Sequence, residues 1–472
     1  MKKQITTILA FLFSIILMNQ AGNTYYSQMN STGSIATLER IDIIPSDPAL
    51  SLPRDIGMRS SCLNRIDSIV RDGILSRAFP GCRVLVLKDG KPWYDKCFGN
   101  YTYEAVQKVN PNTMYDLASL SKTTGTLLAI MKLYDTGKLK LNDKVSYYLN
   151  FLNGTGKKDL TINELLFHES GFPASLPFYR LATEKNTTPS FLASSKTTSN
   201  IVRMGGYKLP NAVLKYKEDW VSKIPSEGFT SQVSDSFYIN NRFHKAAMQL
   251  IADAHLNSKA YCYSDLNFIL LKEIVETITG TTLDVFLEKE FFTPMKLEHM
   301  DYLPLRTHKI EEIAPTEKTD FLRNGVIQGY VQDPDAAFFG GISGNAGLFA
   351  SAMDVAKVYQ MILNQGEIDG QRYISKETCR LFTTTTSTSG RRGLGYDKPN
   401  PSNPKHSPCS PSTPKYTYGH TGYTGTCCWV DPVNNLIYVF LSNRTYPNEG
   451  ANKLAKMGIR TKIQEVIYQS IK

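Results

Sequence analysis

A serine and a lysine spaced one helical turn apart have the residue types that nucleophilic catalysis needs. Ser119 and Lys122 form an S-x-x-K pattern that opens an apolar segment predicted to be helical. Residues three apart share a helix face, so the ammonium group can come within hydrogen-bond reach of the hydroxyl. A serine hydroxyl is a poor nucleophile unless a neighbour accepts its proton, and a helix N-terminus favours developing negative charge. For this motif alone, Ser119 as a plain N-cap with a solvated Lys122 is the alternative.

Two later segments carry further polar groups at the edges of predicted elements. The run from Tyr261 to Asp265 reads YCYSD, includes Tyr263, and immediately precedes a predicted helix. The run from Tyr418 to Gly425 reads YGHTGYTG and immediately precedes a predicted hairpin. A tyrosine at a helix start is, taken alone, better explained as a buried aromatic residue. The order of the three segments therefore carries more weight than any one of them.

In this order the three segments resemble the S-x-x-K, Y-x-N and K-T-G triplet of active-site serine β-lactamases and penicillin-binding proteins. The likeness is best to the class C β-lactamase-like branch, which also includes esterases and D-aminopeptidases. It extends from about Leu63 to the C-terminus and includes four further segments. These are Phe79-Pro80-Gly81, Leu165 to Gly171 (LLFHESG), Gly340 to Phe349 (GGISGNAGLF) and Trp429 to Pro432 (WVDP).

The resemblance implies a role for each matching residue. Ser119 would attack a carbonyl group and form an acyl-enzyme, while Lys122 would keep the local potential positive and help to remove the proton. Tyr263 would relay the proton to the leaving group. Its ordinary pKa near 10 is too high for a base at neutral pH, so a flanking cation such as Lys122 would have to lower it. Backbone N–H groups of Ser119 and Tyr423 would hold the oxyanion. This chemistry requires no metal ion and no organic cofactor.

Two positions of the substrate-binding segments depart from the penicillin-recognising pattern. Asp265 stands where Asn is usual, and His420, before Thr421 and Gly422, stands where Lys is usual. An Asn amide can donate to a substrate carbonyl, but an ionised Asp cannot. A Lys is a permanent cation for a substrate carboxylate, whereas a His is largely neutral at pH 7. We therefore expect slow β-lactam turnover, and we expect that Asp265 could bind Lys122 and keep it protonated.

The resemblance, with these departures, implies a serine hydrolase that acts through an acyl-enzyme on an ester or an amide, and the apolar N-terminus adds that it is exported. The substrate would be a small molecule or a cell-wall peptide, such as one containing D-amino acids. A true β-lactamase or D,D-peptidase is the first alternative, and a non-catalytic envelope-binding module of the same fold is the second.

The predicted elements place the three segments around one sheet. A helix over 62–77 and a hairpin over 82–98 come first, and a hairpin over 426–442 and a helix over 451–471 come last. This order predicts an α/β fold of the α+β type, in which an antiparallel sheet is flanked by the N- and C-terminal helices. A mostly helical lobe over about 119–335 would be inserted, with helices that include 266–279 and 283–292. Residues 173–259 are polar and weakly periodic, and would include loops that overhang the cleft.

One cysteine pair has a predicted position in the first hairpin. With Asp89-Gly90 as a two-residue loop, Cys82 falls opposite Cys97. An exported protein could oxidise this pair to a disulfide, and two free buried thiols are the alternative.

The N-terminus has the pattern of a secretory signal. Lys2 and Lys3 precede an apolar run from Ile5 to Met18 that is shorter than a membrane span. We expect a signal peptide over 1–21, an irregular segment over 22–55 and the hydrolase domain over 56–472. The mature protein would be periplasmic or secreted, without a membrane span; an uncleaved anchor is the alternative. The net charge of +10 comes from scattered Lys and Arg without a nucleic-acid motif, so we expect no nucleic-acid partner.

Overall fold

The computed structural model describes residues 43–45, 62–184, 201–204, 207–210, 214–320, 322–323, 325–388 and 392–471. The predicted signal peptide and most of the irregular segment after it lie outside these residues. Within the described part of the chain, no helix is long and apolar enough to cross a membrane.

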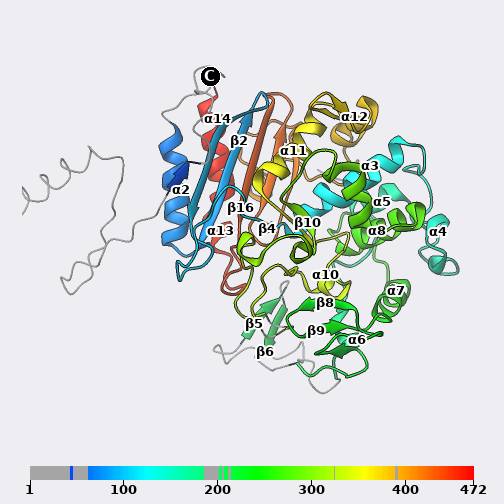
Figure 1. Cartoon of the computed structure of the whole chain (residues 1–472). Coiled ribbons are helices and arrows are strands. Elements are labelled where there is room, and N and C mark those ends of the chain that lie inside the picture. The colour runs from blue at the N-terminus through cyan, green and yellow to red at the C-terminus, as the bar shows by residue number, and fades with distance from the viewer. Residues whose placement is uncertain are drawn as a thin grey trace, which may run out of the picture. The chain divides into compact units, whose positions relative to one another are not determined.

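The central sheet joins the two ends of the described chain. Its strand order is β1-β3-β2-β16-β15-β14, and every pair from β3 to β14 is antiparallel. Helices α2 and α14 pack together beside one face, and α11 covers the other face (Figure 1). The predicted α/β fold is therefore confirmed. The elements are β1 (Ile43–Pro45), α2 (Leu63–Leu75), β2 (Gly81–Lys88), β3 (Lys91–Gly99), α11 (Ala352–Leu363), β14 (Tyr418–Thr421), β15 (Cys427–Asp431), β16 (Leu436–Ser442) and α14 (Ile459–Ser470).

The register of the β2–β3 hairpin differs from the prediction. The pairing shifts by one residue just after Pro92, where Trp93 is an extra residue without a partner in the ladder. Such a β-bulge changes which residues lie opposite one another in all later pairs. Cys97 consequently lies opposite Arg83 instead of Cys82. Since neighbouring residues of a strand point to opposite faces, Cys82 and Cys97 lie on different faces of the sheet, and both are free and buried. The predicted opposition of the two cysteines is wrong.

Most of the regular secondary structure described between β3 and β14 is helical. Its helices besides α11 are α3 (Leu127–Asp135), α4 (Val145–Tyr148), α5 (Ile162–Phe167), α6 (Tyr179–Ala182), α7 (Phe243–Asp253), α8 (Asp265–Thr279), α9 (Leu283–Leu287), α10 (Pro334–Phe338) and α12 (Lys376–Thr384). Short strands form small separate sheets there: β4 (Tyr115–Asp116) with β10 (Met300–Tyr302) and β11 (Leu348–Ala350), β7 (Val221–Ser222) with β8 (Ser231–Ser234) and β9 (Phe237–Ile239), β5 (Ile201–Met204) with β6 (Tyr207–Pro210), and β12 (Glu367–Ile368) with β13 (Gln371–Arg372).

Three segments differ from their predicted secondary structure: one contains additional elements, and two predicted helices are interrupted. Residues 173–259, predicted to include loops, also contain the β7-β9-β8 sheet and helix α7. The predicted helix over 283–292 is α9 followed by a π-helical turn over Glu288–Phe292. The predicted C-terminal helix is divided into α13 (Lys453–Lys456) and α14 at Gly458, which has a positive φ of 62°.

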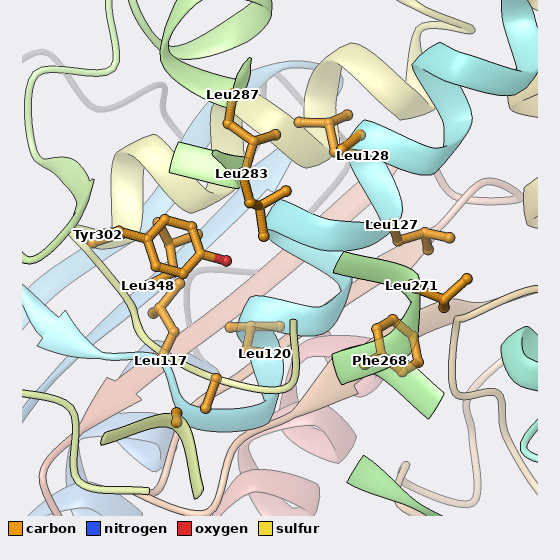
Figure 2. Close-up of a cluster of buried hydrophobic side chains, with 14 of the residues drawn as sticks. Leu117, Leu120, Leu127, Leu128, Phe268, Leu271, Leu283, Leu287, Tyr302 and Leu348 are labelled. Carbon is orange, nitrogen blue, oxygen red and sulfur yellow. The ribbon is translucent and has the colours of Figure 1, made fainter. Parts of the chain in front are cut away.

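A buried apolar cluster holds the Ser119 segment against the helices around it. Figure 2 shows side chains from α3, α8 and α9 converging on the residues that flank the serine. Burying one such side chain stabilises a fold by roughly 1.5–3 kcal/mol, so the cluster fixes how the Ser119 segment sits against α8. The labelled members are Leu117, Leu120, Leu127, Leu128, Phe268, Leu271, Leu283, Leu287, Tyr302 and Leu348.

Candidate active site

The backbone around Ser119 is strained and held in place. Ala118, immediately before the serine, has a φ of 47°, in the left-handed region that costs energy for a residue with a side chain. The carboxylate of Asp116 accepts the Ala118 N–H at 2.8 Å and the Gln332 N–H at 2.7 Å. Burial raises the pKa of Asp116 to about 6, and these two backbone donors oppose that rise. Asp116 therefore connects the serine turn to the loop before α10.

The sequence pattern predicted that Ser119 opens an α-helix, and this prediction is wrong. Ser119 lies in a 3₁₀ turn over Ala118–Leu120, and a π-helical turn over Lys122–Thr126 separates it from α3. Single π turns are rare and occur often at functional sites. The predicted contact nevertheless forms, because Lys122 Nζ donates to Ser119 Oγ at 3.0 Å.

Lys122 is completely buried, and its ammonium group makes two hydrogen bonds and one ion pair. Besides Ser119, its ammonium group donates to the backbone oxygen of Asn345 at 2.9 Å and lies 2.6 Å from Asp265 Oδ1. An ammonium group has three donors and no acceptor. Burial acts to lower the pKa of Lys122, but Asp265 and Tyr263 outweigh it and raise this pKa to about 12. Lys122 is therefore a protonated hydrogen-bond donor at neutral pH, as the Asp265 substitution predicted.

The glycine-rich loop before β11 supplies a contact that the sequence did not reveal. A Cβ at Gly344 would lie 1.8 Å from the backbone oxygen of Phe268 in α8, so only glycine allows this close approach. The approach brings the Asn345 carbonyl to Lys122, while Asn345 Nδ2 donates to Asp333 Oδ1 at 3.0 Å. The sequence included this loop only as a segment of the family resemblance, and no residue pattern indicated that its backbone binds the lysine.

Tyr263 lies among aromatic and charged side chains from four other segments. Its ring centroid is 4.6 Å from that of His168 and 6.0 Å from that of His420. Lys122 Nζ and the guanidinium carbon of Arg392 each lie 5.1 Å from the Tyr263 ring centroid. Burial raises the pKa of Tyr263 above its ordinary value, and the two cations offset only part of that rise. The expectation that a cation would bring this pKa below its ordinary value is therefore not met in the unliganded site.

His168 supports the Tyr263 ring as a neutral imidazole. Its Nδ1 accepts the backbone N–H of Ser264 at 3.1 Å and faces Asn267 Nδ2 at 3.1 Å. Burial, with Arg392 and Lys122 nearby, lowers the pKa of His168 well below its ordinary value. Two donors on Nδ1 assign the ring proton to Nε2. The sequence included this histidine only in the LLFHESG segment of the family resemblance, which gave no indication of its contact with the tyrosine.

The turn between β14 and β15 is fastened to the nucleophile segment. Thr424 Oγ1 donates to the backbone oxygen of Asp116 at 2.7 Å, and Thr426 Oγ1 donates to that of Leu117 at 2.9 Å. A Cβ at Gly422 would lie 2.2 Å from the Leu117 oxygen and 2.0 Å from Thr426 Oγ1. This packing keeps Tyr423 next to the serine turn, where the oxyanion donor was predicted.

The remaining predicted site residues lie on the edge strand of the central sheet. His420 and Thr421 belong to β14, the last strand in the sheet order. His420 is buried, and its Nδ1 lies 2.7 Å from the Thr421 carbonyl oxygen. The structure thus brings the S-x-x-K, YCYSD and HTGY segments to one place, with Tyr263 between Lys122 and His420.

Comparison with known proteins agrees with this geometry. The sequence profile of the Beta-lactamase family matches residues 66–457. The fold and this match define a serine hydrolase of the β-lactamase-related class. The chain belongs to the β-lactamase family.

Individual relatives span nearly the whole chain. This chain is 30% identical over 421 residues to a "Putative D-alanyl-D-alanine carboxypeptidase" of Escherichia coli O157:H7, and the alignment covers 84% of this chain and 85% of that protein. The solved structure of "EstCE1, a hydrolase with promiscuous acyltransferase activity" has a TM-score of 0.59 at 18% identity, covering 86% of this chain and 98% of that one. A class C β-lactamase has a TM-score of 0.58 at 16% identity, covering 86% and 96%. The two structures share the fold with this chain.

Proposed function

We propose that this protein is an exported serine hydrolase that cleaves esters or amides through an acyl-enzyme on Ser119. The observation that carries the proposal is the 3.0 Å hydrogen bond from the buried Lys122 ammonium to Ser119 Oγ. A structural N-cap with a solvated lysine, the alternative for this motif, would not need a fully buried cation. A non-catalytic module would likewise have no use for it.

The positions of the side chains suggest a separate catalytic role for each residue. Because the raised pKa keeps Lys122 protonated at neutral pH, and an ammonium group has no acceptor, Lys122 stabilises negative charge and cannot accept a proton. Tyr263 is then the base: its phenolate takes the Ser119 proton as Oγ bonds to the substrate carbonyl carbon. The carbonyl π electrons move to oxygen, and the backbone N–H groups of Ser119 and Tyr423 hold that oxyanion.

The second half of the reaction restores the enzyme. The tetrahedral intermediate collapses, the bond to the leaving oxygen or nitrogen breaks, and the Tyr263 hydroxyl gives its proton to that atom. Water then attacks the acyl-enzyme, Tyr263 accepts a proton from it, and Ser119 leaves as the proton returns to Oγ.

The substrate we favour is a peptide or amide of the cell wall that contains a D-amino acid. The E. coli relative is named as a putative D-alanyl-D-alanine carboxypeptidase, which supports a wall peptide as the substrate. D,D-carboxypeptidase activity is therefore the second candidate function. Against penicillins, Asp265 and His420 replace the amide donor and the fixed cation of the family pattern. Neutral esters, which need neither group, are accordingly the simplest test substrates.

An extracytoplasmic location is part of the proposal. Lys2, Lys3 and the apolar run from Ile5 to Met18 have the pattern of a secretory signal, and a wall peptide is reached outside the cytoplasm. N-terminal sequencing of protein from the periplasm or medium should begin near Gly22. Recovery of the chain with Met1 in a membrane fraction would contradict this part.

The function is tested by comparing three substrates on one preparation. We expect measurable kcat/KM for a neutral short-chain ester and for a peptide ending in D-Ala-D-Ala, and a lower value for nitrocefin. Ser119→Ala, which removes one oxygen from a turn held by backbone bonds, serves as the matched inactive control. A nitrocefin rate above the ester rate would instead identify a β-lactamase.

A further inference from the structure

Arg392 is a buried cation beside Tyr263 that no catalytic motif includes. Arg392 is 3% exposed. Its guanidinium carbon lies 5.1 Å from the ring centroid of Tyr263 and 5.8 Å from that of Tyr261. Nε donates to Tyr261 Oη at 3.2 Å. Nη1 has no hydrogen-bond partner among the residues that the structure describes. A guanidinium group is a planar, delocalised cation, so this side chain places positive charge beside the ring.

The other charged or titratable groups around Tyr263 supply little net positive charge. The Lys122 cation is paired with Asp265 at 2.6 Å. The His168 imidazole is neutral because burial lowers its pKa, and His420 stands where the family pattern has a lysine. Arg392 is paired more loosely, since its Nη2 lies 3.6 Å from Asp397 Oδ2. Of these groups, Arg392 has the charge that is least compensated.

We propose that Arg392 is the positioning residue that supplies the positive potential for proton transfer by Tyr263. In the family pattern this potential would come from the unpaired S-x-x-K lysine and the K-T-G lysine. In this chain Asp265 neutralises the first, and His420 replaces the second. Arg392 lies against the ring face of the tyrosine and acts through it, without contact to the reacting atoms. The inference rests on the proposed function, since it assigns the electrostatic support of the base in that reaction.

The effect is directly measurable on the phenol itself. Replacement of Tyr263 by 3,5-difluorotyrosine makes the phenol more acidic, so that its titration falls in the accessible pH range, and it provides a ¹⁹F NMR signal at that one site. A cation about 5 Å away favours the phenolate. In Arg392→Gln the midpoint of this titration should rise by about one pKa unit, and Arg392→Lys should restore most of the shift. This arm needs no turnover, so it stays informative even if Ser119 is not the nucleophile.

Kinetics separates this role from a structural one. With native Tyr263, Arg392→Gln should lower kcat/KM for a neutral ester about tenfold at pH 7, with most of the loss in kcat. Introducing difluorotyrosine into Arg392→Gln should recover much of that loss, because the more acidic phenol compensates for the missing charge. Damage to the fold would not be recovered in this way.

Lys398 offers a matched control on the same segment. It is also buried, and its Nζ donates to the backbone oxygen of Thr383 at 2.6 Å. Burial lowers the pKa of Lys398 to about 8, so the comparison is made below that pH, where the side chain is a cation. Lys398→Met should leave the ¹⁹F midpoint unchanged. The inference is overturned if Arg392→Gln leaves the midpoint unchanged as well. It is also overturned if the substitution raises KM only for carboxylate-bearing substrates, which would make Arg392 an anion-binding residue.

Discussion

Asp265→Asn should make this enzyme faster, because the carboxylate neutralises the cation that the reaction uses. Asp265 Oδ1 lies 2.6 Å from Lys122 Nζ, and its side chain is 22% exposed. Two unit charges at this separation attract by about 6 kcal/mol at an effective dielectric constant of about 20. Exposure of the carboxylate reduces this value. An asparagine has the same shape and keeps an oxygen toward Lys122, so the geometry of the site should persist.

The expected gain follows from the two pKa values that Asp265 raises. Asp265 contributes to the elevated pKa of Lys122 and to that of Tyr263. Removal of the Asp265 charge should lower the pKa of Lys122 by roughly one to three units, as for other close ion pairs. It should lower the pKa of Tyr263 by about one unit. Each unit increases the phenolate fraction tenfold at a pH below the pKa. A more acidic phenol is also a weaker base, so we expect kcat/KM to rise roughly three- to tenfold.

The assay is kcat/KM for a neutral ester between pH 7 and 9, where the wild type should gain activity with rising pH as Tyr263 ionises. Glu276→Gln is the matched control, since it breaks an ion pair on the same helix: Glu276 Oε2 lies 2.7 Å from Lys272 Nζ and the side chain is 21% exposed. The control should leave kcat/KM unchanged. A lower or equal rate for Asp265→Asn across this range would refute the assignment of Tyr263 as the base.

Three further predictions concern the sheet edge and the residues behind it. His420→Lys should raise nitrocefin kcat/KM by about one to two powers of ten, because it restores a charge-assisted hydrogen bond worth roughly 1.5–3 kcal/mol to a carboxylate. Gly422→Ala should lower ester turnover at least a hundredfold without loss of expression, because its Cβ would meet Leu117 O and Thr426 Oγ1 and move an oxyanion donor. Burial raises the pKa of Glu449 from 4.5 to about 7, so its ionisation destabilises the fold as pH rises through that window. By thermal unfolding, Glu449→Gln should be more stable than wild type at pH 8, by at most about 3 kcal/mol, and equally stable at pH 4.5.

The sequence was sufficient for features that depend on local patterns. The apolar period of α2 and α8, the turn of each hairpin and the spacing from Ser119 to Lys122 all predicted what the structure shows. The local order of residues also indicated Asp265 as a partner for Lys122, because the family pattern places that position next to the lysine. These features need only residue type and short spacing.

Other features depend on contacts between distant segments. The bulge at Trp93 shifted Cys97 by one position, because neither the turn residues nor the alternation of the strands contains information about an extra residue. The Asn345 carbonyl reaches Lys122 only because Gly344 lets two segments meet, and its side chain plays no part in that contact. Arg392 lies between two tyrosines that are far away in sequence, so its type and spacing gave no indication of a role.

Covalent labelling of Ser119 is the most direct test of the account. The wild-type protein is treated with a fluorophosphonate, and the modified peptide is located by mass spectrometry, with Ser119→Ala as the control. We expect one adduct, on Ser119, and no adduct on the variant, which should keep the thermal stability of the wild type. An adduct on another residue, or labelling that persists in Ser119→Ala, would contradict the assignment of the nucleophile and the mechanism built on it.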